Sequence, residues 1–238
     1  MNWRTLIASG TLALAALALT GCGNRSSTFR YRLTVEVDTP QGVKTGSSVI
    51  EVDLTDTGDG AWVLPDARGI NAELRGEAVA VDLPGGQALF ALLRTEQDGD
   101  AAVWFAHRAV NAPPQFDGEY AGIRRTDYMK EHKLAGVLEG ANRPMLVTFG
   151  DPADPTSVAR VDPDDLAATF GNGVILRGIT VQLTDDPVTS GIEERLGWLE
   201  RAQGAIGKIP ISERPPIGTP LPLHATLTDS SFKQGTNR

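Results

Sequence analysis

The sequence predicts an α+β fold that is mostly antiparallel β, a sheet or sandwich of about 8–10 short strands with two short helices in the C-terminal half. The 238 residues are 41% hydrophobic, which is enough for one domain with its own core. The 26 glycines and 15 prolines exceed the usual share of a globular chain, so turns should be frequent and strands short. Segments that alternate apolar and polar residues recur along the chain, and there is no internal repeat of about 20–50 residues.

The clearest elements form a hairpin near the N-terminus. From Phe29 to Asp38 every second residue is apolar, which is typical of a strand with one face buried. Thr39-Pro40-Gln41-Gly42 has the composition of a turn, and Val43–Leu54 returns as a second long strand.

Further short strands are expected between turn-forming sequences. The segment 87–94 could instead be a helical turn, because alanine and leucine dominate it, and the segment 128–139 fits either a helix or a strand. The expected strands are Ala61–Leu64, Glu77–Leu83, Gln87–Arg94, Ala101–Arg108, Pro144–Phe149 and Val174–Leu183.

Two helices are indicated by their N-terminal signals. Asp162 precedes proline and two further acids, so a short helix is expected over Pro163–Phe170, ending before Gly171. Ser190-Gly-Ile-Glu193 has the spacing of a capping box and predicts a second helix that extends to about Gln203. From Gly204 the chain is rich in proline and should be extended, with disorder after about Ser230.

The N-terminus has the pattern of a secretory signal. Its apolar run, Leu6–Leu19, is 14 residues long, whereas a membrane-spanning helix needs about 20 and a signal-peptide core about 7–15. The predicted organisation is a signal peptide at 1–21, a polar tether at 22–28, one β-rich domain at 29–203 and a proline-rich tail at 204–238.

Leu19-Thr20-Gly21-Cys22 resembles a bacterial lipobox, in which an apolar residue and two small residues precede a cysteine. The resemblance implies that Cys22, the only cysteine, receives a diacylglyceryl group and that a peptidase cuts between Gly21 and Cys22. Further acylation of the new amino group, with palmitate for example, would give stable anchoring, which needs more than one acyl chain. Gly23 is not the aspartate that retains lipoproteins in the inner membrane, so the resemblance favours the outer membrane, facing the periplasm.

Three stretches of the body resemble a family of proteobacterial hypothetical proteins, many of which have secretory or lipoprotein leaders and none of which has an assigned activity. The stretches are Phe29–Val37 with Thr45–Val52, Pro144–Phe149 leading to Asp154–Val158, and Val161–Gly171 through Asp186–Glu193. The resemblance implies one domain in the cell envelope and assigns no catalytic residue.

Charge and cysteine content exclude several classes. The net charge of −8 argues against nucleic acid or an anionic lipid surface as the main partner, because both require a basic face. A single cysteine excludes an intramolecular disulfide framework and a cysteine-rich zinc site.

Candidate catalytic residues occur without a recognised motif. The histidines His107, His132 and His224 lack metal-ligand spacing, and Ser47-Ser48 lies in a predicted strand, unlike a nucleophile elbow. The acidic residues that we considered for a metal or acid-base role are better explained as turn and helix-cap residues: Asp53, Asp56, Asp59, Asp151, Asp154, Asp162, Asp164 and Asp165.

Large apolar residues are candidates either for the core or for a partner patch. These are Trp62, Trp104 and Trp198, and in the tail Ile209, Ile211, Ile217 and Leu221. The sequence predicts a lipoprotein held to the membrane through Cys22, without a cofactor, whose body is a non-enzymatic binding or structural module for an envelope partner. The alternatives are a periplasmic hydrolase with a carboxylate- or serine-based site, and a spacer without a ligand.

Overall fold

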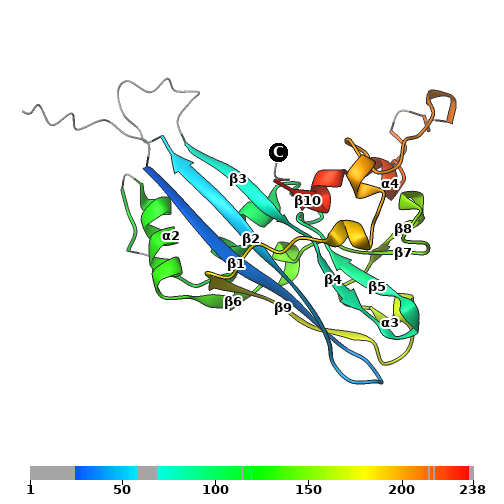
Figure 1. Cartoon of the computed structure of the whole chain (residues 1–238), viewed down its shortest axis with the longest axis horizontal. Coiled ribbons are helices and arrows are strands. Elements are labelled where there is room, and N and C mark those ends of the chain that lie inside the picture. The colour runs from blue at the N-terminus through cyan, green and yellow to red at the C-terminus, as the bar shows by residue number, and fades with distance from the viewer. Residues whose placement is uncertain are drawn as a thin grey trace, which may run out of the picture.

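The computed structural model describes residues 25–57, 69–113, 115–118, 120–213, 215–216 and 218–235. Its strands form two antiparallel sheets, as Figure 1 shows, and this confirms the predicted mostly antiparallel α+β fold. The six-stranded sheet has the order β10-β3-β2-β1-β9-β6 and the four-stranded sheet the order β4-β5-β7-β8. The strands are β1 Arg25–Asp38, β2 Lys44–Asp56, β3 Ile70–Glu77, β4 Val79–Asp82, β5 Ala88–Ala91, β6 Ala135–Val137, β7 Leu146–Phe149, β8 Val158–Val161, β9 Ile175–Thr184 and β10 Lys233–Gln234.

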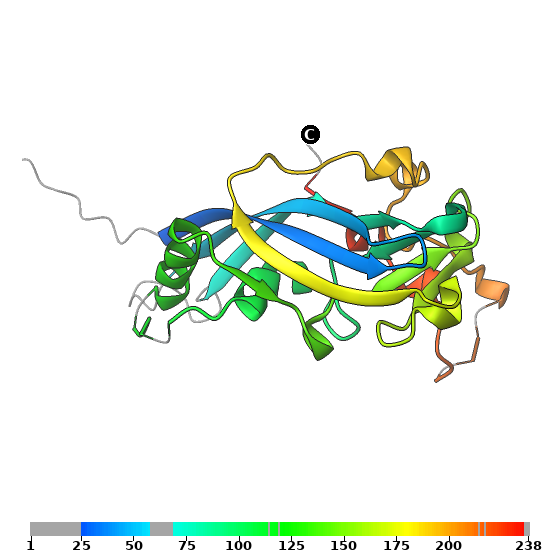
Figure 2. The same cartoon turned by 90° about the horizontal axis from the view of Figure 1, so that it is seen from below.

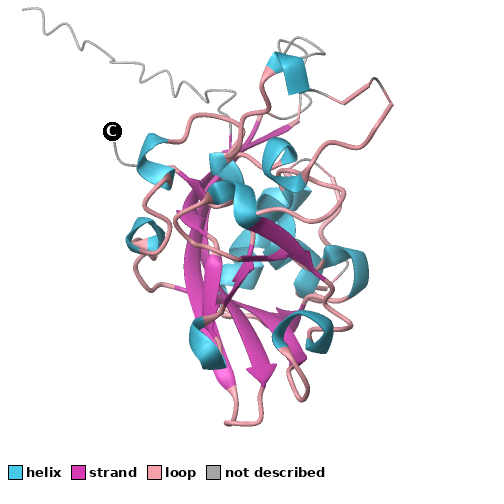
Figure 3. Cartoon of the chain, turned by 90° about the vertical axis from the view of Figure 1, so that its right-hand side faces the viewer, coloured by secondary structure: helices cyan, strands magenta, loops and turns pink. Residues whose placement is uncertain are grey.

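The helices are short and connect the strands, as the colouring of Figure 3 shows. The α-helices are α1 Phe105–Ala109, α2 Ala121–Glu131, α3 Ala167–Phe170 and α4 Leu223–Thr226. Single 3₁₀ turns are η2 Pro84–Gly86, η3 Ala101–Trp104, η4 Gly140–Asn142, η5 Pro155–Ser157, η6 Ile192–Glu194, η7 Leu199–Arg201, η8 Ile211–Glu213 and η9 Asp229–Ser231. Among the described residues, no helix is long and apolar enough to cross a membrane.

Strand β1 is the centre of the longer sheet. It pairs with β2 along almost its whole length and with β9 on its other side. Its five inward side chains are buried to 1% exposure or less: Phe29, Tyr31, Leu33, Val35 and Val37. The predicted hairpin is therefore confirmed, because strict alternation along 10 residues leaves only one register that buries all apolar groups.

The four-stranded sheet is covered on both faces. Leu89 and Ala91 of β5 belong to the core beneath the six-stranded sheet, whereas Phe90 and Leu92 belong to a second core on the opposite face. C-terminal segments close the second core with Trp198 and Phe232. Figures 1 and 2 show these segments against the smaller sheet, so this part of the molecule has three layers. Of the expected strand Gln87–Arg94 only β5, Ala88–Ala91, is observed, and burial on both faces explains why this apolar segment lacks a two-residue period.

The two sheets lie in close contact at Gly46 of β2. A Cβ atom placed there would lie 2.1 Å from the Ala80 carbonyl oxygen of β4, so only glycine admits this contact. The glycine thus allows the backbone of the smaller sheet to rest directly on the larger one.

The strand predicted over Ala101–Arg108 is wrong, since the chain forms η3 and α1 there. Its residues are Ala101-Ala-Val-Trp-Phe-Ala, and four of these six are alanine or valine packed in the core. A short apolar run that is buried all round does not distinguish a strand from a helix by its pattern, and alanine favours the helix.

The helix predicted from Ser190 to Gln203 is reduced to the single turns η6 and η7. The expected capping box does not form, because Glu193 pairs with Lys233 and the Ile192 N–H donates to the Glu77 carboxylate at 3.0 Å. A carboxylate 115 residues away thus takes the place of the local cap.

The other predicted helix is confirmed in part. Within Pro163–Phe170 only α3 is helical, and the carboxylate that accepts a first-turn N–H, from Ala168, belongs to Asp165 and not to Asp162. The ambiguous segment 128–139 contains both alternatives, the end of α2 and then β6. Strands β3 and β8 were not predicted, and the expected strand Ala61–Leu64 lies outside the described residues.

Both ends of the body are more ordered than predicted. The expected polar tether is wrong from Arg25 onward, because β1 begins there and Ser27 is buried, donating to Asp127 at 2.6 Å. The disorder expected after Ser230 is wrong for residues 231–235, since Phe232 is fully buried and β10 pairs with β3, whereas residues 236–238 lie outside the described residues. Aromatic burial at 232 outweighs the proline-rich composition before it.

Replacing Gly46 with alanine should destabilise the protein by about 3 kcal/mol, because the new methyl group would push β4 away from β2. Denaturant unfolding measures this loss. Gly178→Ala in β9 is the matched control, because a Cβ there meets nothing within 4 Å, and it should change stability by no more than about 0.5 kcal/mol. Equal losses in the two variants would contradict the importance of the Gly46 contact.

Candidate functional site

His107 in α1 is the most chemically distinctive side chain, because it joins α1 to α2 inside the fold. Its Nε2 lies 2.9 Å from the Thr126 hydroxyl oxygen, and that hydroxyl donates to the Gly122 carbonyl at 2.9 Å. Since the hydroxyl proton is already used, the imidazole must donate through Nε2–H. Nδ1 then carries a lone pair that is buried, and no described group donates a hydrogen bond to it.

The surroundings of His107 keep it neutral. Phe29 and Trp104 contact the ring edge-to-face, with centroids at 5.7 and 5.5 Å. Burial, and secondarily the positive charge of Arg125, lower the pKa of His107 from 6.5 to about 4. Arg125 also donates to the carbonyls of His107 and Val110, so its own position is fixed by the end of α1.

This arrangement lacks the parts of a hydrolase. Within the described residues, the only side chain that hydrogen-bonds to the His107 ring is Thr126, and no carboxylate orients the ring. A general base also needs a pKa near the working pH, which this imidazole does not have. His107 is best explained as a structural hydrogen-bond donor between two helices.

The serine pair is not a nucleophile site. Ser48 is 1% exposed, points into the core, and has a hydroxyl oxygen without a hydrogen-bond partner in the described structure. Ser47 points to the opposite face and accepts a hydrogen bond from Arg32 at 3.3 Å. Their hydroxyls therefore face different environments, as neighbouring residues of a strand must.

The aspartates that we considered as ligands mostly bind nearby backbone. Asp151, Asp154, Asp162 and Asp165 each accept from a backbone N–H two or three residues later, and Asp164 pairs with Arg143. Asp53 accepts from Thr28 across the hairpin, Asp56 belongs to β2, and Asp59 lies outside the described residues. In the part of the chain that the structure describes, no three His, Cys, Asp or Glu side chains cluster where they could hold a metal ion.

The remaining histidines lie apart from one another. His132 stacks on Tyr128 at 4.0 Å on the exposed side of α2, and its Nδ1 is 2.9 Å from the Tyr128 carbonyl. His224 in α4 packs against Gly207, where a Cβ would lie 2.5 Å from the ring. Neither contacts His107 in the described structure.

The tryptophans that are described belong to the cores. Trp104 packs on the first core, and Trp198 is 8% exposed in the second, donating to the Pro152 carbonyl at 3.1 Å. Trp62 lies outside the described residues.

Two of the tail hydrophobics line a hollow of about 520 Å³ above α4, namely Ile209 and Leu221. The side chain of Ile211 and the whole of Ile217 are not described. The other described residues around this hollow are Ala205, Gly207, Lys208, Pro215 and Ala225, and among them Lys208 is the only one with an acid, base or nucleophile.

Sequence reasoning missed two buried carboxylates. Glu51 of β2 is 5% exposed and lies between Arg30 and Arg75, with N–O distances of 2.6 and 2.9 Å. The three residues are direct neighbours across β1, β2 and β3. Glu77 at the end of β3 is 6% exposed and binds the start of η6. The alternation around Glu51 placed it outward, but only the strand register reveals its two partners.

No family model, curated protein or solved structure matches this chain. Functional inference therefore depends on the chain's own residues.

The low pKa of His107 predicts that the protein loses stability in acid. The unfolded chain binds a proton near pH 6.5 and the folded chain only near pH 4, so this contribution is complete above pH 6.5 and is lost as the pH falls toward 4. His107→Gln keeps a donor but does not titrate, and should reduce the difference in unfolding free energy between pH 7 and pH 4 by up to about 3 kcal/mol. Chemical denaturation across this range measures it. His132→Gln, on the exposed side of α2, controls for replacing any histidine, and an equal effect there would refute the assignment.

Ser48→Ala should leave stability unchanged or raise it by up to about 1 kcal/mol, because it removes a buried hydroxyl that lacks a partner. A loss above about 2 kcal/mol would show instead that the hydroxyl has a stabilising partner, such as a buried water. Thermal and denaturant unfolding of the variant decide between these outcomes.

Proposed function

We propose that the protein is a lipid-anchored envelope lipoprotein, attached through Cys22 to the outer membrane, and that its body is a non-enzymatic binding or structural module facing the periplasm. The observation that carries the proposal is the Leu19-Thr20-Gly21-Cys22 motif after a 14-residue apolar run, with the only cysteine of the chain at its end. The net charge would become −9 after removal of residues 1–21, so acyl chains and not charge would hold the body to an anionic membrane.

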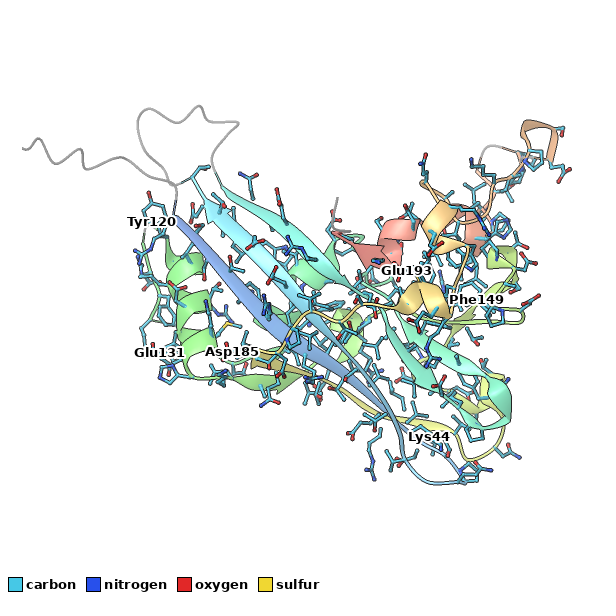
Figure 4. All side chains as sticks on the ribbon, in the orientation of Figure 1. Lys44, Tyr120, Glu131, Phe149, Asp185 and Glu193 are labelled. Atoms are coloured by element: carbon cyan, nitrogen blue, oxygen red, sulfur yellow. The ribbon has the colours of Figure 1, made fainter. Side chains whose placement is uncertain are left out.

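The structure adds a geometric consequence to this anchor. Strand β1 begins at Arg25, three residues after Cys22, and three residues span at most about 10 Å. The end of the sheet where β1 starts, β2 ends and β3 starts would therefore lie beside the membrane, together with α2. The opposite end, with the turn at Thr39–Gly42 and Lys44, would lie about 45 Å farther away. Figures 1 and 4 show these two ends at opposite sides of the molecule.

A binding or structural role accounts for the polar groups better than catalysis does. His107, Glu51 and Glu77 are each engaged in contacts that join secondary-structure elements. The hydrolase alternative would require a base, a nucleophile and a carboxylate to converge on an open hollow. Glu77 lines a hollow of about 240 Å³ with Ser47, Ser190, Glu194 and Arg195. Its carboxylate accepts from the Ile192 N–H, Arg195 pairs with Asp82, and His107 is not among the described residues that line this hollow. The module proposal needs only exposed surface with a defined shape.

Cys22→Ser should abolish incorporation of labelled palmitate and leave an uncleaved precursor in a bacterium that processes lipoproteins, because the thiol is the acceptor of the lipid. Fluorography and intact-mass measurement follow the two effects. Adding Ser26→Cys to this variant is the matched control, because it restores a thiol four residues away without the preceding Leu-Thr-Gly. Palmitate in either variant would contradict the assignment.

A further inference from the structure

We propose that the free edge of β6 binds an extended peptide segment of a partner protein, which adds to the six-stranded sheet as an antiparallel strand. The peptide would place an apolar side chain over the hollow beside β6 and a basic side chain next to Glu139. The inference deepens the proposed binding function by naming the class of partner, and it rests on that proposal for the role of the body as a binding module.

The register of β6 shows which backbone groups are free. Ala135, Gly136 and Val137 lie opposite Gln182, Val181 and Thr180 of β9. Leu183 donates to the Leu134 carbonyl and Leu138 donates to the Ile179 carbonyl, both at 2.9 Å. In an antiparallel pair the bonded positions alternate, so Leu134, Gly136 and Leu138 bond to β9. The N–H and C=O groups of Ala135 and Val137 therefore point away from the sheet.

The outward N–H and C=O groups of Ala135 and Val137 lie at the edge of the sheet, where no further described strand pairs with them. Strand β6 is the last member of its sheet, and within the described residues β9 is the only strand that pairs with it. The Val137 side chain is 51% exposed, although it belongs to a strand. Figure 2 shows β6 beside β9 at the border of the sheet. A row of unpaired donors and acceptors on an edge is a template for another strand.

Other sheet edges are less suitable. Strand β10 has only two residues, and β8 carries Arg160, which pairs with Glu96 at 3.2 Å. A charged side chain and a short length are the usual means of protecting an edge from pairing. Strand β6 is also short, with three residues, but its outward-facing positions Ala135 and Val137 carry no charge.

The hollow beside β6 defines the side chains of the occupant. It measures about 380 Å³ and is lined by Ala109, Val110, Asn111, Leu134, Ala135, Gly136, Val137 and Glu139. Six of these eight residues have apolar side chains or none, polar and apolar atoms line the hollow about equally, and Glu139 is the only charged residue among the described ones that line it. An added strand therefore needs an apolar residue opposite Gly136 and a cation opposite Glu139.

A second copy of the chain is the competing occupant. Antiparallel self-pairing about Gly136 would place Lys133 opposite Glu139 of the other copy. Such pairing in one continuous sheet has its two-fold axis perpendicular to the sheet, so the strands of the two copies run in opposite directions. The two Cys22 anchors would then lie at opposite ends of the pair and could not enter the same membrane. A peptide from a different protein has no such constraint.

The test uses the synthetic peptide Lys-Thr-Val-Leu-Val-Thr-Glu, designed so that its two valines lie opposite Val137 and Ala135. Fluorescence anisotropy with the purified full-length protein in detergent measures its binding. Methylating the backbone nitrogens of both valines removes the bonds to β6 and should abolish binding. Methylating the leucine and the second threonine, whose N–H groups would point away, should leave binding unchanged.

Variants of the protein test the same edge. Val137→Pro removes only an N–H that β9 does not use, and should weaken binding by at least about tenfold. Val137→Lys should also weaken binding, whereas Ile175→Lys, at the start of β9 and 60% exposed, should not. Amide hydrogen exchange should be fast at Ala135 and Val137 and should slow there when the peptide binds, with Gly136 slow throughout.

Three results would overturn the proposal: no binding of the peptide, the same loss with either pair of methylated nitrogens, or a dimer whose Ala135 and Val137 amides are protected without peptide. The Cys22→Ser variant separates this inference from the anchor. If that variant still binds the peptide but the parent takes up no palmitate, the lipid-anchor proposal is wrong and the peptide-binding proposal for β6 is supported. If the parent takes up palmitate but binds no peptide, the lipid-anchor proposal is supported and the peptide-binding proposal is wrong.

Discussion

The close contact between Gly46 and the Ala80 carbonyl is the constraint on which the rest of the structure depends. It brings the backbone of the smaller sheet directly onto the larger one, so the inward residues of β4 and β5 complete the first core. The other face of the smaller sheet is then left apolar, with Phe90, Val147 and Phe149 uncovered by the larger sheet. The C-terminal segments must cover that face. This explains why Trp198 and Phe232 are buried although they lie near the C-terminus.

The buried polar groups are used to connect elements that are distant in sequence. Ser27 binds Asp127, Glu77 binds the N–H of Ile192, and Trp198 binds the carbonyl of Pro152. Each bond satisfies a group that would be costly to bury alone, and each holds together two segments that are far apart in the sequence. Side chains that resemble catalytic groups in the sequence, such as His107, therefore take part in contacts between elements.

The sequence predicts the parts of this fold that follow a local rule. The β1–β2 hairpin could be predicted because its alternation is strict, whereas Ala101–Arg108 could not, because a fully buried apolar run has no period to read. The turn at Ile192 depends on Glu77, which only the tertiary structure brings near. The environments of His107 and Glu51 depend on neighbours from other elements, and the free groups of β6 depend on a register with β9 that no local pattern contains.

The proposed anchor and the proposed peptide site on β6 would together fix the direction of a bound partner. Strand β6 pairs with the part of β9 that lies opposite residues 32–34 of β1, about 25–30 Å along the sheet from Arg25. Two antiparallel pairings relate β1 to β6, so β6 runs in the same direction as β1, which with the proposed anchor would be away from the membrane. A peptide added antiparallel to β6 would therefore run toward the membrane, with its basic residue at the far side near Glu139. This geometry would suit a partner whose chain continues toward the membrane to which the proposed anchor attaches Cys22.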